Sequence, residues 1–212
     1  MVRFFNKPKF LIPTIIIAIL AVIFTRQLSS NSSSLLSGLS FAETILSSPT
    51  PVPVQEVTYK SEVYSPDGTM KVVMNKTSKN QTLANYTFTV SEVSGTNEKI
   101  IFSKTLGENQ EIQIPENSWS PDNKYLFLKE NDISYLSFMV FKANGESFAD
   151  GSEFIDVVPL FEEKKFGYNL SDITGWDSNN LLHIFTVKEN GTKGQSYWFD
   201  VGGKIFYILG SR

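Results

Sequence analysis

The pattern of hydrophobic and polar residues divides the chain into four segments. Residues 1–9 carry three basic side chains, and residues 10–25 form an apolar run without a charge, as expected of a helix in a membrane. Residues 26–58 are rich in serine and end in alternating prolines, a composition that predicts an extended linker. In residues 59–212 short runs of alternating apolar and polar residues lie between turn-forming residues, which predicts a domain of β-strands.

The alternation is clearest where Tyr86, Phe88 and Val90 are separated by threonines, the pattern of a strand with one buried face. The runs 134–142 and 204–209 each lie close to a turn signal, Asn-Gly or Gly-Gly, and therefore predict β-hairpins. The run 204–209 is so apolar that we expect both of its faces to be buried. No apolar pattern with a helical period follows the linker, so no helix is predicted there.

A turn motif recurs three times in the predicted β-domain. Tyr64-Ser-Pro-Asp-Gly and Trp119-Ser-Pro-Asp-Asn each lead into an apolar strand, and a degraded copy starts at Trp176. The aromatic residues are 55 and 57 positions apart, which indicates a structural repeat. In such a turn Pro presets φ, Asp accepts a backbone hydrogen bond, and Gly or Asn takes the left-handed position. Ser178 replaces Pro in the third copy, so that turn should be looser. The structural turn positions are Tyr64, Pro66, Asp67, Gly68, Trp119, Pro121, Asp122, Asn123, Trp176 and Asn179.

These repeats resemble those of TolB-type β-propellers, in which an aromatic-Ser-Pro-Asp-Gly turn joins two strands of a four-stranded blade. The resemblance covers about residues 59–209. It implies contacts with other proteins or a scaffolding role in the cell envelope, without catalysis by the blades. Closed propellers usually have about 4–8 blades, whereas this chain has room for about three. The ends of such an arc would be covered either by dimerisation into a ring of about six blades or by collapse of the sheets into a compact β-domain.

The distribution of charge predicts where each segment lies. Residues 1–26 contain four basic and no acidic side chains, whereas the rest of the chain contains 15 basic and all 22 acidic ones. Three basic residues precede the apolar run and one follows it, which places the N-terminus in the cytoplasm and the β-domain outside it. We therefore expect a signal anchor with the membrane as a partner, and a cleaved secretory signal is the alternative. The predicted fold class is all-β, with about three propeller-like antiparallel sheets, plus one N-terminal transmembrane helix.

The chain offers few side chains for catalysis or metal binding. It has no cysteine and a single histidine, His183, which lies in an apolar run and is expected to be a hydrogen-bonded strand residue. Asp150, Glu153 and Asp156 lack the spacing of an EF-hand loop, and no nucleophile or phosphate-binding motif occurs. We therefore predict no catalytic residue, no cofactor and no metal site. Trp198 is the candidate contact residue, with packing between blades as the alternative.

Composition also narrows the class of partner. The predicted β-domain is acidic and its only arginine is Arg212, so it lacks the basic patch and the arginines that nucleic-acid binding needs. The chain is predicted to be a membrane-anchored extracytoplasmic β-repeat domain that binds another envelope protein or a surface polymer. Two copies of the chain could form a homodimer. It is predicted not to be an enzyme. The alternatives are an accessory subunit or enzyme that acts on extracellular peptides or glycans, and a cleaved, secreted form of the same domain.

Overall fold

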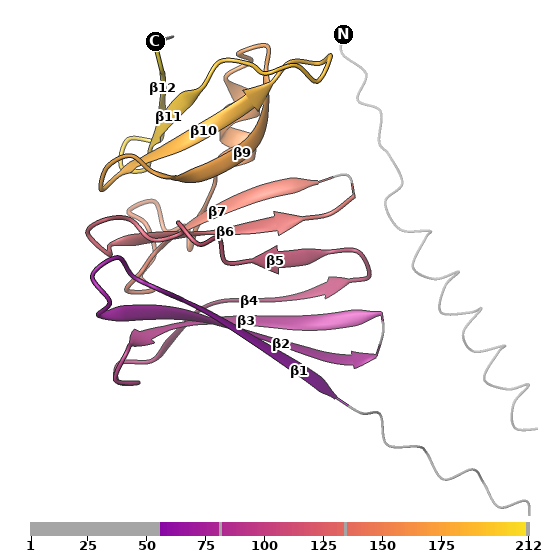
Figure 1. Cartoon of the computed structure of the whole chain (residues 1–212), viewed down its shortest axis with the longest axis vertical. Coiled ribbons are helices and arrows are strands. Elements are labelled where there is room, and N and C mark those ends of the chain that lie inside the picture. Colours follow the sequence, from indigo (N-terminus) through magenta and orange to yellow (C-terminus); the bar gives the residue numbers. More distant parts are fainter. Residues whose placement is uncertain (1–55, 81, 134, 211–212) are drawn as a thin grey trace, which may run out of the picture. The chain divides into compact units, whose positions relative to one another are not determined.

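Three antiparallel sheets follow one another along the chain (Figure 1). The computed structural model describes residues 56–80, 82–133 and 135–210. The first sheet contains β1 (Val57–Tyr64), β2 (Met70–Asn80), β3 (Leu83–Glu92) and β4 (Lys99–Gly107). The second sheet contains β5 (Glu111–Gln113), β6 (Tyr125–Asn131), β7 (Leu136–Lys142) and β8 (Ile155–Asp156). The third sheet contains β9 (Asn169–Trp176), β10 (Leu181–Val187), β11 (Tyr197–Asp200) and β12 (Ile205–Ile208). Three four-stranded antiparallel sheets are consistent with a partial propeller-like fold.

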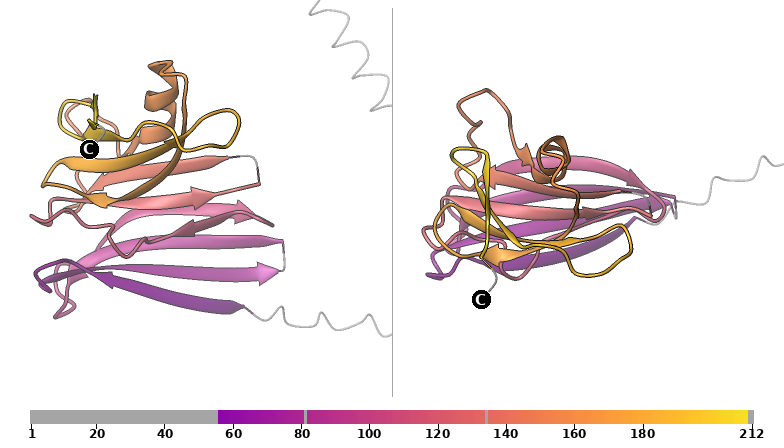
Figure 2. Two further views of the ribbon diagram at one scale, coloured as in Figure 1. Left: turned by 45° about the horizontal axis from the view of Figure 1, so that its top comes forward. Right: turned by 90° about the horizontal axis from the view of Figure 1, so that it is seen from above.

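The sheets are stacked face to face, with the second sheet between the other two (Figures 1 and 2). Two apolar clusters hold this stack together, one on each side of the second sheet. Leu126, Leu128 and Met139 belong to the cluster shared with the first sheet, whereas Phe127 and Phe138 belong to the cluster shared with the third. Because successive side chains of a strand point to opposite faces, a strand that is covered on both sides needs the unbroken apolar run found in β7.

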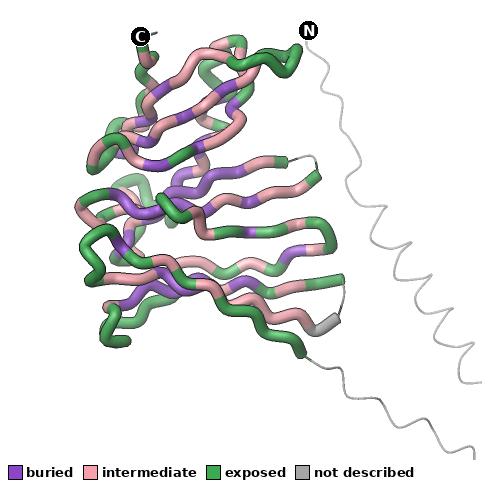
Figure 3. The backbone as a smooth tube through the Cα atoms, viewed as in Figure 1, coloured by how far each residue is buried: buried purple, intermediate pink, exposed green. Residues whose placement is uncertain are grey.

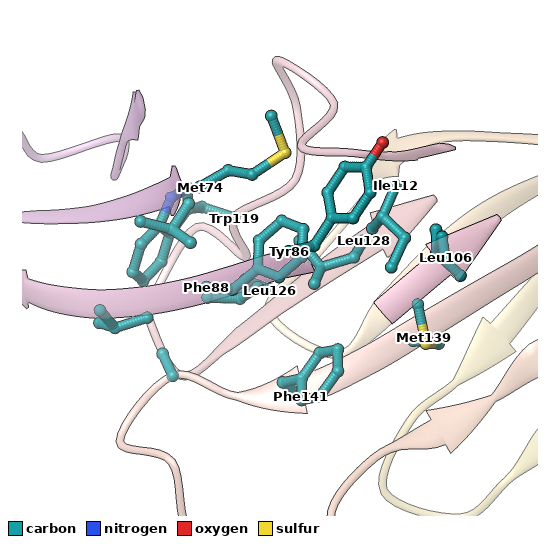
Figure 4. Packing of buried hydrophobic residues seen from close by; sticks show 13 residues of the cluster. Met74, Tyr86, Phe88, Leu106, Ile112, Trp119, Leu126, Leu128, Met139 and Phe141 are labelled. Carbon is teal, nitrogen blue, oxygen red and sulfur yellow. The ribbon is translucent and has the colours of Figure 1, made fainter. Parts of the chain in front are cut away.

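The cluster between the first two sheets is built on large side chains of β3 (Figure 4). Tyr86 and Phe88 are fully buried, and Val90 is 2% exposed, as the alternating pattern predicts. Phe141 of the second sheet packs in the same cluster, together with Trp119 from the second turn motif. The burial along the tube in Figure 3 is concentrated where the sheets face one another.

The two end faces of the stack differ in chemistry. In the first sheet the residues that alternate with the buried ones on β2 and β3 are mostly polar, and Thr87 shares a 3.1 Å hydrogen bond with Ser103 of β4 on that face. In the third sheet the register places His183, Trp198 and Tyr207 side by side across β10, β11 and β12. The outer face of the first sheet is therefore polar and that of the third sheet is largely aromatic.

The sequence pattern missed one helix. Helix α2 (Val157–Glu163) connects the second and third sheets, and the carboxylate of Asp156 accepts a 3.3 Å hydrogen bond from the N–H of Val158 as its N-cap. Phe161 is fully buried and contacts Tyr197 edge to face at 5.2 Å between ring centroids. Seven residues make about two helical turns, too few for a helical period to stand out between strands.

The predicted fold class is wrong in its helical part. Among the residues that the structure describes, no helix is long and apolar enough to cross a membrane. The predicted membrane segment 10–25, the basic segment 1–9 and almost all of the predicted linker 26–58 lie outside the described residues. The correction is an all-β fold of three antiparallel sheets with one short helix in its described part.

The run 204–209 is not buried on both faces as predicted. It forms the edge strand β12, where Ile205 and Tyr207 are each 47% exposed and Ile208 is 64% exposed. Only Phe206 packs against the cluster between the second and third sheets. Hydrophobicity along a strand does not reveal whether a neighbour covers it, so an apolar edge strand has the same sequence pattern as a central one.

Candidate functional site

The first turn motif is closed by side-chain hydrogen bonds. The hydroxyl of Ser65 donates to Asp67 at 2.7 Å and accepts from the N–H of Met70 at 3.0 Å. Gly68 has a φ of 70°, in the left-handed region that glycine tolerates best. Hydrogen bonds from the N–H of Thr69 and from the Ser65 hydroxyl hold the pKa of Asp67 well below its usual range. The carboxylate of Asp67 therefore acts as a structural cap of the turn.

The second motif repeats this geometry residue by residue. The hydroxyl of Ser120 donates to Asp122 at 2.9 Å and accepts from the N–H of Tyr125 at 2.9 Å. Asn123 stands where the first motif has glycine and has a φ of 58°. Burial alone would raise the pKa of Asp122, but hydrogen bonds from Lys124 and Ser120 outweigh it and leave that pKa lowered. The two turns are therefore built by the same local chemistry.

The third motif uses a different polar side chain. Asp177 occupies the position that serine has in the other two copies, and its N–H donates to Leu181 at 2.9 Å. Its Oδ2 lies 3.2 Å from Nδ1 of His183 and accepts a hydrogen bond from Nε1 of Trp198. The exposed Asn179 lies in this turn. The third copy thus connects its turn to the outer face of the third sheet.

A recurring hydrogen bond ties each motif to the one before it. Nε1 of Trp119 donates to the carbonyl oxygen of Val63 at 3.3 Å, and Nε1 of Trp176 donates to that of Ser118 at 2.8 Å. Each acceptor is the residue that precedes the aromatic residue of the earlier motif. The motif tryptophans therefore fix the position of successive sheets relative to one another.

The three turns together line a hollow of about 500 Å³, which we call the turn groove. Half of the ten predicted turn positions line it, namely Tyr64, Pro66, Trp119, Pro121 and Trp176. The other five do not line it; they are Asp67, Gly68, Asp122, Asn123 and Asn179. The aromatic and proline positions of the repeat thus share one hollow, whereas Asp67, Gly68, Asp122 and Asn123 shape the first two turns.

Sequence reasoning missed the polar residues of the turn groove. Glu116 and Asp177 contribute carboxyl groups, Asn117 an amide and His183 an imidazole, and the lining contains no Lys or Arg. The amide nitrogen of Asn117 donates to the carbonyl oxygen of Thr174 at 3.4 Å. One signal was available in the sequence, because the acidic residue that replaces serine in the third copy distinguishes that turn from the other two.

The turn groove continues onto the aromatic end face of the stack. His183 also lines a second hollow of about 510 Å³, together with Phe185 and Lys193. The ring of His183 stacks on Phe185 at 4.8 Å, and Nζ of Lys193 lies 5.4 Å from the centre of the Phe185 ring. Trp198 lies on this outer face between His183 and Tyr207, away from the buried cluster to which its neighbours in β11 belong.

Two of the three acidic residues of the segment 150–156, Asp150 and Asp156, have structural partners. Asp150 pairs with Lys204 and accepts from the hydroxyl of Ser152 at 2.6 Å. Asp156 caps α2 and accepts from the hydroxyl of Tyr135 at 2.9 Å, and Glu153 is exposed. Within the part of the chain that the structure describes, no group of three or more His, Cys, Asp or Glu side chains could hold a metal ion.

Comparison with known proteins gives a structural likeness without a family. No family model matches the chain, and no curated protein matches it. Among solved structures it is similar to the AtxE2 isopeptidase, as a variant with astexin3-dC4 bound, with a TM-score of 0.48 and 13% identity. It is also similar to the same isopeptidase without a ligand, with a TM-score of 0.46 and 12% identity. Each match covers 73% of this chain and spans 30% of the isopeptidase.

This comparison conflicts with the prediction that the chain is not an enzyme. The solved structures that it resembles are isopeptidases, so the prediction is not kept. With TM-scores of 0.46–0.48 and 12–13% identity, the likeness assigns no activity to this chain.

Proposed function

We propose that the chain is a β-repeat domain of the TolB-propeller type that binds another protein of the cell envelope through the turn groove. The observation that carries this proposal is the composition of the groove, because all three repeats contribute their motif aromatic residue to one hollow. The prolines also preset their turns, and the two tryptophans join successive repeats, but neither role requires Tyr64, Pro66 and Pro121 to face the same hollow.

The surroundings of the groove support binding of a macromolecule. Tyr64 is 48% exposed, Pro66 and Pro121 are exposed, and the aromatic end face adjoins the groove at His183. Exposed aromatic rings with little conformational freedom are enriched in protein interfaces. The hydrogen bond from Trp198 to Asp177 holds one of these rings in place before any partner arrives. The location outside the cytoplasm remains a prediction from the apolar run 10–25.

The test is site-specific photo-crosslinking in the full chain. A photoreactive amino acid replaces Tyr64 or Pro121 in the groove, and Glu163 of α2 serves as the exposed control position. We expect a covalent adduct with one envelope protein from both groove positions and none from the control. Adducts of equal yield from all three positions, or none from the groove, would refute a binding role for this surface.

A further inference from the structure

The turn groove combines two kinds of group that attract cations. Its lining contains Tyr64, which is 48% exposed, and the partly buried Trp176, whereas Trp119 is 4% exposed and belongs to the cluster between the first two sheets. The face of an exposed aromatic ring attracts an ammonium or guanidinium group. Its lining also contains the acidic residues Glu116 and Asp177 and no Lys or Arg, and the one imidazole in it, that of His183, lies 3.2 Å from Asp177. The charge of the groove is therefore complementary to a basic partner.

The shape of the groove fits an extended chain. It is lined by turns from three successive sheets, and stacked sheets lie about 10 Å apart. The groove thus extends over roughly 20 Å, which an extended peptide spans with about six residues at ~3.3 Å each. A hollow of about 500 Å³ is also within the range of specific binding sites.

Several of the walls are already fixed in position. The indole N–H groups of Trp119 and Trp176 are tied to the preceding repeat, and Asp177 is held by Trp198 and lies next to His183. Binding would therefore order few groove side chains, which lowers its entropic cost. The same carboxylates would repel phosphate groups, so the groove is unsuited to nucleic acids or anionic lipids.

We infer that the turn groove binds an extended peptide segment of its partner that presents a Lys or Arg side chain to the exposed ring of Tyr64 and to the carboxylates of Glu116 and Asp177. This inference rests on the proposed function and names the chemistry of the partner.

The test is fluorescence anisotropy of labelled, end-blocked hexapeptides with the full chain. Three probes share the sequence Gly-Ala-Xaa-Ala-Gly-Ala, with lysine, norleucine or glutamate as the third residue. We expect the lysine peptide to bind at least about tenfold more tightly than the norleucine peptide, because norleucine keeps the apolar stem and lacks the charge. The glutamate peptide should bind least. Higher salt should weaken only the lysine peptide, since salt screens exposed charges.

A matched pair of variants tests the residues. Glu116→Gln should weaken the lysine peptide about three- to tenfold and leave the norleucine peptide unchanged. Glu163→Gln removes the same charge from α2, outside the groove, and should change neither. Equal binding of the lysine and norleucine peptides, no binding of any peptide, or equal effects of the two variants would overturn the inference. If crosslinking at Tyr64 still succeeded in that case, the proposed function would stand with a partner of different chemistry.

Discussion

Removing Lys104 should destabilise the fold far more than neutralising its partner Glu130. This pair joins β4 of the first sheet to β6 of the second, with Nζ of Lys104 at 2.7 and 2.8 Å from the two carboxylate oxygens. The two side chains differ in burial, because that of Lys104 is 41% exposed and that of Glu130 only 4%. In Lys104→Met the carboxylate of Glu130 would remain buried without its cation.

The magnitudes follow from that asymmetry. Loss of one partner of a fully buried pair costs about 3–5 kcal/mol, and because water can enter along the position of Lys104 we expect about 2–3 kcal/mol for Lys104→Met. In Glu130→Gln the ammonium group can turn to solvent, so the cost should be about 0.5–1 kcal/mol. The double variant Lys104→Met with Glu130→Leu should recover most of the loss, because it leaves no buried charge.

Urea denaturation of the full chain, followed by circular dichroism, measures these differences as changes in the free energy of unfolding. Lys60→Met is the control, because Lys60 pairs with Glu62 at 3.9 Å and both side chains are substantially exposed; we expect less than about 0.5 kcal/mol. The reasoning is refuted if Lys104→Met costs no more than Glu130→Gln or than the control.

Three further predictions follow from the turns and from the end faces. The pKa of Asp67 is lowered in the folded protein, so its contribution to stability is present above the usual value of 3.8 and is lost as the pH falls below that value. In acid titrations between about pH 5 and 2, the free energy of unfolding of Asp67→Asn should therefore decline less than that of the wild type. An equal decline would contradict this. Gly68→Ala should cost about 1 kcal/mol in urea denaturation, because its φ is 70° although no atom within 4 Å opposes a Cβ; an unchanged midpoint would show that the turn relaxes. In sedimentation experiments the chain should form monomers or dimers only, since the polar outer face of the first sheet cannot receive the aromatic face of another copy, and a ladder of larger species would disprove this.

The sequence predicted best what depends on neighbouring residues. The positive φ values of Gly68 and Asn123 follow from the chemistry of the turn, which is contained within five residues. The alternation in β3 likewise predicted the burial of Tyr86, Phe88 and Val90, because the period of a strand is local. It did not predict the burial of the intervening Thr89 and Ser91, which are 5% and 4% exposed. Three repeats with these properties were enough to predict about three antiparallel sheets, and the resemblance to propeller blades implied four strands in each.

Features that depend on distant residues were not predictable in the same way. The turn groove exists because turns 55 and 57 residues apart meet, so the role of Glu116 as part of its lining has no local signal. The exposure of β12 depends on its place at the edge of the third sheet, which the hydrophobicity of its residues does not reveal. Asp177 contacts Trp198 21 residues away, and only its departure from the repeat pattern marks it.

The contrast between the two end faces gives the stack a direction. The polar face of the first sheet terminates it, as capping repeats terminate solenoid proteins, whereas the aromatic face of the third sheet is open to addition. Two copies that contact each other through the aromatic outer faces of their third sheets would be related by a twofold axis. Only the polar outer faces of their first sheets would then remain at the ends of the pair. Such a pair is closed, so the same feature that permits self-association also prevents growth into filaments.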